Sequence, residues 1–214
     1  MSSLDYKFSY RRRLPHFQPE GYALFVTFRL KGSIPQAVLE EWQQQKAIAE
    51  NRLRLIQDSD ECRRERYDEQ KGQYGRYDRF LDQASHGPTW LKNKQIAQIL
   101  VDAMHYRDEK VYGLDAFCLM SNHAHIVFEP LAKEDGSYHS LPSIMHSLKR
   151  FTAEKANLVL GRTGRPFWQP ESYDHVIRDR GERERIIKYV LNNPVAAGLV
   201  ESWDEWPWSY CKYF

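Results

Sequence analysis

The chain has 214 residues, of which 42% are hydrophobic and 28% charged, and its formal net charge at pH 7 is +2. This length is sufficient for one domain with a hydrophobic core, or for one domain with an insertion. Because the sequence has no apolar run of about 18 residues and no apolar core after its first charges, we expect neither a membrane span nor a secretory signal. The three cysteines are widely spaced and odd in number, which argues against a disulfide framework and favours the cytoplasm.

Positive charge is concentrated in two separate segments. Residues 1–34 contain six Lys and Arg against two Asp and Glu, and residues 141–200 contain ten against six. Residues 35–90, which lie between them, contain nine against eleven. Two basic segments are consistent with a polyanionic partner, and equally with ordinary solvated surface.

The N-terminal part of the chain predicts an arm followed by a strand. Residues 1–20 are polar and basic, which is typical of an arm or loop. Residues 21–30 (GYALFVTFRL) are dominated by aromatic, aliphatic and β-branched side chains, which favour a strand. The Gly32-Ser33 pair that follows marks the end of this strand.

Residues 35–88 predict a helical insertion. Pro35 suits the first turn of a helix, and apolar residues recur after it at helical intervals. Residues 59–77 are highly charged and poor in apolar side chains, so a helix there would be mostly solvated. The sequence His86-Gly87-Pro88 ends the segment. A helical arm that binds DNA or a partner and a merely tolerated insertion both fit this pattern.

The second half of the chain alternates helices and strands. In chain order we expect a helix at 94–106, strands at 111–120 and 123–129, a helix at 141–160, a strand at 173–177 and a helix at 182–192 that Pro194 ends. Together with the first strand, this order predicts an α+β fold, a ferredoxin-like split βαβ sandwich with a central antiparallel sheet and a helical insertion. We expect a single domain over residues 1–214.

Two histidines in one predicted strand form the first candidate site. They lie in residues 119–128 (LMSNHAHIVF), and strand alternation places His123 and His125 on the same face of the sheet. Two imidazoles on a rigid strand provide half of a metal site. By chance alone, about 0.3 His-x-His pairs are expected in a sequence of this composition. The motif by itself therefore fits two core histidines as well as two metal ligands.

Tyr189 and Asn193 form the second candidate site. They are four residues apart in a predicted helix, so their Cβ atoms would lie about 5–6 Å apart. Near a metal, the amide of Asn193 could be a third ligand, and the phenol of Tyr189 could attack a phosphate that the metal holds. A phenol has a pKa of about 10, and a nearby cation or base would activate it. A tyrosine in a helix is otherwise far more often a packing residue.

These two motifs together resemble a known family. The His-Ala-His sequence after residues 117–122 (FCLMSN) resembles the histidine motif of the HUH single-tyrosine transposases. Residues 189–200 (YVLNNPVAAGLV) resemble the tyrosine helix of the REP-associated tyrosine transposases. Supporting matches are FWQ at 167–169, YDHVIRD at 173–179 and WPWS at 206–209. The resemblance covers residues 11–30 and about 90–210, with the motifs in the family's order, and it favours the functional interpretation of each.

The resemblance implies the HUH palm fold and a metal-dependent transposase that nicks and rejoins single-stranded DNA at hairpin-forming repeats. His123 and His125 would bind Mg²⁺ or Mn²⁺, and Asn193 would supply a third ligand. Tyr189 would attack the scissile phosphate, forming a 5′-phosphotyrosine and releasing a 3′-hydroxyl. Residues 35–88 exceed what a minimal member of the family needs, and the resemblance assigns them no role.

Basic residues are the candidates for DNA contact. They are Arg11, Arg12 and Arg13 for the guide strand, Lys149 and Arg150 for phosphate, and Arg178, which could instead pair with Asp174 or Asp179. A salt-dependent affinity for single-stranded hairpin DNA is expected. The alternatives are a domesticated protein that binds repeat hairpins without cutting them, and an RNA-binding protein. We expect a monomer, with a dimer as the alternative.

Overall fold

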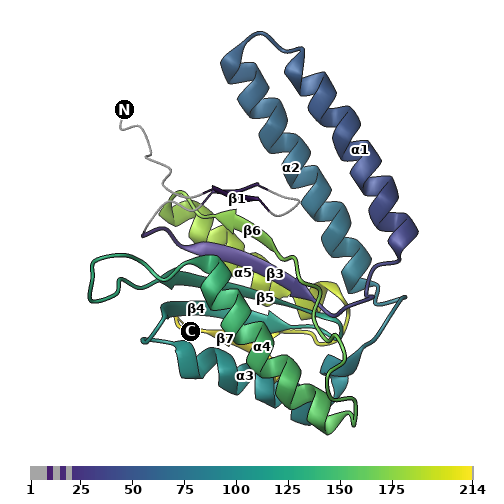
Figure 1. Ribbon diagram of the computed structural model, residues 1–214, viewed down its shortest axis with the longest axis vertical. Coiled ribbons are helices and arrows are strands. Elements are labelled where there is room, and N and C mark those ends of the chain that lie inside the picture. The colour runs from purple at the N-terminus through teal and green to yellow at the C-terminus, as the bar shows by residue number, and fades with distance from the viewer. Residues whose placement is uncertain (1–8, 12–14, 18–20, 214) are drawn as a thin grey trace. The chain divides into compact units, whose positions relative to one another are not determined.

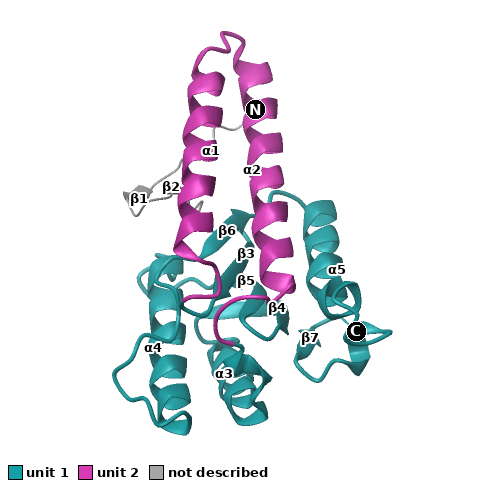
Figure 2. Cartoon of the chain, turned by 90° about the vertical axis from the view of Figure 1, so that its right-hand side faces the viewer, with its two compact units in different colours: residues 1–31, 89–214 teal, residues 32–88 magenta. Residues whose placement is uncertain are grey.

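The structure is a computed structural model, and it describes residues 9–11, 15–17 and 21–213 (Figure 1). The chain divides into two compact units, shown in different colours in Figure 2. The sheet unit comprises residues 1–31 and 89–214, and the helical unit comprises residues 32–88. None of the helices in the described ranges combines the length and the hydrophobicity needed to cross a bilayer.

A five-stranded antiparallel sheet forms the centre of the sheet unit. In spatial order its strands are β6 (Tyr173–Val176), β3 (Leu24–Arg29), β5 (His123–Pro130), β4 (Tyr112–Leu119) and β7 (Ser209–Cys211). Each neighbouring pair is antiparallel. Two short strands, β1 (Ser9–Arg11) and β2 (Pro15–Phe17), pair separately as a hairpin.

The chain order of these elements confirms the ferredoxin-like prediction. The helices of the sheet unit are α3 (Lys94–Arg107), α4 (Leu141–Val159) and α5 (Arg180–Ala196), with short 3₁₀ turns η1 (Trp90–Lys92) and η2 (Trp203–Glu205). Along the path β3–α3–β4–β5–α4–β6, the first to fourth strands are β3, β4, β5 and β6. Across the sheet they lie in the order β6, β3, β5, β4, which is fourth, first, third, second. That order is the split βαβ arrangement. Strand β7 adds a fifth position beside β4.

One face of the sheet is covered by α3 and α4 (Figures 1 and 2). Alternate residues of the central strands point into this hydrophobic core, including Leu24, Val26 and Phe28 of β3 and Ala124, Ile126 and Phe128 of β5. They pack with apolar side chains of α3 and α4 such as Leu100 and Leu148. The side chains at the alternating positions between them therefore point to the other face.

The opposite face of the sheet carries polar side chains and is covered by α5 (Figure 2). Helix α5 contacts β4 and β5. Thr27 pairs directly with His125, and Arg29 pairs directly with His123, across the β3–β5 ladder. All four side chains are buried. The two predicted histidines thus lie between the sheet and the helix that carries Tyr189.

Pro194 does not end α5, and the prediction that it would was wrong. The helix continues to Ala196 with Pro194 inside it. The proline lies in the last turn, where Ala197 donates a backbone hydrogen bond to Asn193 and Leu199 donates one to Pro194 itself. Packing of the buried proline outweighs the local preference that a proline imposes on the preceding residue. As a result, Asn193 lies inside the helix rather than beyond it.

The helical unit is a pair of long helices, α1 (Gln36–Arg54) and α2 (Ser59–Asp82). The Asp58 side chain caps α2 by accepting hydrogen bonds from two backbone N–H groups at 2.9 and 2.7 Å. The Trp42 ring packs on Phe80, with their centroids 5.7 Å apart. The two ends of the unit meet: a Cβ added to Gly87, whose φ is +75°, would lie 2.2 Å from the Gly32 carbonyl oxygen. The chain thus enters and leaves the helical unit at neighbouring points.

Candidate active site

His123 and His125 direct their Nε2 atoms toward each other from the buried face of β5. The two atoms are 3.0 Å apart, and neither side chain is exposed to solvent. A cation held about 2.1 Å from each nitrogen at a right angle would place the nitrogens about 3.0 Å apart. The separation therefore fits two adjacent ligands of an octahedral ion. It also fits a hydrogen bond between the two imidazoles in the absence of an ion.

Each imidazole is also held through its other nitrogen. His123 Nδ1 lies 2.7 Å from Asn122 Oδ1, and His125 Nδ1 lies 2.8 Å from Thr27 Oγ1. Because a carboxamide oxygen only accepts, His123 donates from Nδ1 and presents the lone pair of Nε2 toward His125. Contacts of this kind fix the orientation of metal-binding histidines. The sequence predicted Asn122 only as a turn residue and did not single out Thr27.

Burial also sets the protonation of His123. The pKa of His123 is lowered well below its ordinary value, first by burial and second by the neighbouring His125. The imidazole of His123 is therefore neutral at pH 7, and neutral imidazole is the form that binds metal ions.

Arg29 is a third unusual group on this face of the sheet. It is 3% exposed, and it lies opposite His123 in the strand ladder. Its Nη1 donates a long, 3.5 Å hydrogen bond to the Leu30 carbonyl, and its Nε has no hydrogen-bond partner among the described residues. A buried guanidinium without a counter-ion is costly, so an anion bound here would stabilise it. The signal in the sequence was one charged residue in an apolar strand, and sequence reasoning missed it.

Tyr189 of α5 lies beside the histidine pair. Its ring centroid is 6.0 Å from that of His125 and 6.1 Å from that of Phe25. The side chain is 38% exposed, so solvent or a substrate can reach it. Asn193, one turn further along, is buried and donates from Nδ2 to the Tyr189 carbonyl at 3.1 Å. The described contacts of Asn193 include neither imidazole, and its role as a metal ligand stays a prediction.

A charged network anchors α5 to the sheet. Arg183 donates from Nε and Nη2 to the two carboxylate oxygens of Asp115, at 2.7 and 2.8 Å, and from Nη1 to Glu129 at 3.1 Å. Tyr213 donates to the same carboxylate at 2.8 Å. The ladder of β4 is irregular between Leu114 and Ala116, so Asp115 lies at a bulge. The hydrogen bonds to Asp115 raise the pKa of Arg183. The network fixes where α5, and with it Tyr189, lies on the sheet.

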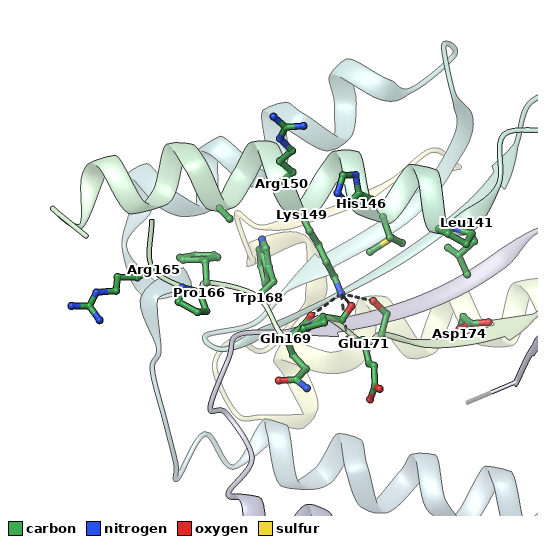
Figure 3. A pocket seen from close by; sticks show the side chains of 16 residues that line it. Leu141, His146, Lys149, Arg150, Arg165, Pro166, Trp168, Gln169, Glu171 and Asp174 are labelled. Atoms are coloured by element: carbon green, nitrogen blue, oxygen red, sulfur yellow. Dashed lines mark hydrogen bonds between the residues drawn. The ribbon is translucent and has the colours of Figure 1, made fainter. Parts of the chain in front are cut away.

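Lys149 and Arg150, both predicted to contact DNA, differ in their surroundings in the structure. Lys149 donates to the Gln169 and Pro170 carbonyls at 2.9 and 3.1 Å and to Ser172 Oγ at 2.7 Å (Figure 3). Its ammonium thereby holds the loop after α4, at the edge of a cavity of about 400 Å³. Arg150 is exposed and points away from this loop in Figure 3.

The other basic candidates lie elsewhere. Arg178 is exposed at the start of α5, and its backbone N–H donates to Glu182 at 2.7 Å. Arg12 and Arg13 lie outside the described residues, and Arg11 ends β1 with a side chain that is not described. DNA contact by any of these residues stays a prediction.

Comparison with known proteins finds similarity to a curated protein and to a solved structure. No protein-family model matches the chain. A curated protein of Haemophilus influenzae, named "Putative REP-associated tyrosine transposase", is 28% identical over 112 residues, which cover 49% of this chain and 60% of that protein. The match thus spans less than two thirds of the relative's length. A solved structure of a REP-associated tyrosine transposase bound to a REP hairpin aligns over 94% of this chain and 82% of that one, at 16% identity and a TM-score of 0.46. The resemblance that the histidine and tyrosine motifs indicated is confirmed by a curated relative of the same name.

Proposed function

We propose that the chain is a metal-dependent REP-associated tyrosine transposase that nicks and rejoins single-stranded DNA at hairpin-forming repeats. The observation that carries this proposal is the position of Tyr189, whose ring lies 6.0 Å from that of His125. A solvent-accessible nucleophile therefore lies beside a pair of converging imidazoles. The similarity to a relative of that name supports the choice of DNA as substrate.

His123 and His125 would hold Mg²⁺ or Mn²⁺, with Asn193 proposed as the third ligand. When bound, the cation would act as a Lewis acid on phosphate oxygens. The neutral state of His123 and the contacts of Asn122 and Thr27 support metal binding by the pair. The guanidinium of Arg29 on the same face, which has no ion-pair partner among the described residues, supports an anionic substrate such as a phosphodiester.

Tyr189 would act as the nucleophile. Its phenolic oxygen forms a bond to phosphorus, and the bond from phosphorus to the 3′ oxygen of the preceding nucleotide breaks. The phenol loses a proton and the departing 3′ oxygen gains one, so the proton count balances. The product is a 5′-phosphotyrosine, which keeps the energy of the phosphodiester bond. Attack by a 3′-hydroxyl would later reverse the step and rejoin a strand.

The test is formation of a covalent adduct. The protein would be incubated with labelled hairpin DNA that carries single-stranded flanks, in the presence of Mn²⁺, and then resolved on a denaturing gel. We expect an adduct with wild-type protein that disappears in Tyr189→Phe and in the presence of EDTA. Tyr106→Phe is the matched control, because Tyr106 is an exposed tyrosine on another helix, and it should keep the adduct.

The same assay distinguishes the alternatives. Tight hairpin binding without an adduct, on DNA with varied flanks, would favour a repeat-binding protein that does not cut. Because Tyr189 lies beside the histidines of its own chain, a monomer is proposed. A mixture of Tyr189→Phe with His125→Ala should then form no adduct, whereas a dimer with exchanged helices would restore it.

A further inference from the structure

A second cavity lies on the solvent side of α5, beside Tyr189. Its volume is about 570 Å³, and it is formed by α5 and the segment that continues to η2. The lining residues on α5 include Arg185, Lys188, Tyr189 and Asn192. These positions are separated by three and four residues, so they form one stripe along the helix. Tyr189 therefore borders both the histidine pair and this cavity, which we call the α5 groove.

Two cations of the α5 groove are free to bind an anion. Arg185 and Lys188 are exposed, and within the described part of the chain neither has an ion-pair or hydrogen-bond partner. The other arginines of the helix differ, because Arg180 pairs with Glu184 at 3.1 Å and Arg183 pairs with Asp115 at 2.7 Å. The helix thus uses some of its cations internally and leaves those of the groove in solvent.

The groove also has an aromatic wall. Trp203 of η2 lines the groove on the side that the segment after α5 forms, and its side chain is partly exposed. Aromatic side chains next to cations are typical of sites for unpaired nucleotides, because bases stack on the rings while phosphates contact the cations. Glu201 belongs to the same segment and also lines the groove. Its negative carboxylate would repel phosphates and so keep them on the α5 side of the groove.

We propose that the α5 groove binds the nucleotides that directly follow the scissile phosphate, with a base stacked on Trp203 and phosphates against Arg185 and Lys188. This inference rests on the proposed function, because Tyr189 is the point at which that strand would become attached. A DNA strand joined to the Tyr189 oxygen would lie next to this groove, because Tyr189 is one of the residues that line it. Unpaired bases are required, since a base within a duplex cannot stack on a side chain.

The experiment measures the contribution of these nucleotides to affinity. The protein is the full chain with Tyr189→Phe, which cannot form the covalent link. The probe is a hairpin selected for tight binding to this protein from a pool with randomised flanks, compared with shortened versions of the same hairpin. The ratio of the Kd of the shortened hairpin to that of the full hairpin measures how much the flank contributes to affinity, and we call this ratio the flank effect. Binding is read by fluorescence anisotropy over a range of salt concentrations.

Trp203→Ala is expected to reduce the flank effect about tenfold, and Trp203→Phe to retain most of it, because phenylalanine can still stack. Arg185→Ala and Lys188→Ala should each weaken binding and lower the magnitude of the log–log salt slope by about 0.7, the value for one phosphate contact on a single strand. Arg180→Ala is the matched control, since Arg180 lies on the same helix outside the groove. It should leave the flank effect unchanged.

The outcomes separate this inference from the proposed function. If wild-type protein forms the Tyr189 adduct but the flank effect is unchanged in the Trp203, Arg185 and Lys188 variants, the groove is not the binding site and the transposase proposal stands. If no adduct forms but these variants lose the flank effect, the groove binds single-stranded DNA in a protein that does not cut. If Trp203→Ala does not fold, a photocrosslinking experiment on protein that keeps Trp203 replaces it. The hairpin then carries 5-iododeoxyuridine at the first flank position. Its photocrosslink should map to Trp203, and a crosslink to another helix would overturn the inference.

Discussion

The Asp115–Arg183 network of the sheet unit and the Arg52 ion pairs of the helical unit differ in how far they are buried. In the sheet unit, Asp115 is 2% exposed and is held in a network with Arg183, while both histidines of the candidate site are fully buried. In the helical unit, Arg52 pairs with Glu65 at 3.4 Å and with Glu69 at 3.7 Å while its own side chain is 60% exposed. Exposed ion pairs contribute little to the free energy of unfolding, whereas removing one partner of a buried ion pair is strongly destabilising. The Asp115–Arg183 network is therefore expected to be more sensitive than the Arg52 ion pairs to the loss of one partner.

The largest expected effect comes from breaking the α5 network. Arg183→Met leaves the Asp115 carboxylate buried without its main partner, and we expect a loss of about 3–5 kcal/mol in the free energy of unfolding. Arg180→Met is the control on the same helix, because its pair with Glu184 is exposed, and it should cost less than about 1 kcal/mol. Urea denaturation of both variants measures the difference. Equal losses would show that burial does not distinguish the two pairs.

Arg29 should show opposite effects on stability and on activity. Replacing this buried guanidinium with methionine removes a charge that has no ion-pair partner among the described residues, so Arg29→Met should raise the free energy of unfolding by about 1–3 kcal/mol. The same change should reduce the yield of the DNA adduct, because the site would lose the cation that we propose as a phosphate partner. Urea denaturation and the adduct assay together test this. A destabilised Arg29→Met variant would mean that the arginine has a structural role.

Thr27 should matter to metal affinity rather than to folding. Thr27→Val keeps the shape of the side chain but removes the hydroxyl that contacts His125 Nδ1, and we expect Mn²⁺ affinity to fall about 10- to 100-fold. Thr27→Ser keeps the hydroxyl and should retain most of the affinity. Calorimetric titration of each protein with Mn²⁺ provides the measurement. Unchanged affinity in Thr27→Val would indicate that the neighbouring strand does not orient His125.

The smallest effect is expected in the helical unit. Arg52→Gln removes exposed pairs with Glu65 and Glu69, and it should change the free energy of unfolding by less than about 1 kcal/mol. Added salt should reduce this difference further, because exposed pairs are screened. Denaturation at low and high salt checks both statements. A loss of unfolding free energy comparable to that of Arg183→Met would remove the contrast between the buried network and the exposed ion pairs.

The sequence allowed the fold class and both candidate motifs to be predicted, because each depends on local patterns and on the chain order of the elements. Strand alternation put His123 and His125 on one face, and helical spacing put Tyr189 near Asn193. The partners of these residues could not be predicted in the same way. Thr27 meets His125 only through the register of β3 on β5, and Asp115 meets Arg183 only through the packing of α5 on β4. Both depend on contacts between distant segments.

The most direct test of the account is to locate the DNA on the protein after reaction. Trypsin cleaves after Lys188, so the peptide 189–212 begins with the proposed nucleophile. After incubation with hairpin DNA and Mn²⁺, nuclease trimming and trypsin digestion, mass spectrometry should find a 5′-linked nucleotide on Tyr189. Strand cleavage with the nucleotide on any other residue, or with no linked nucleotide at all, would contradict the account.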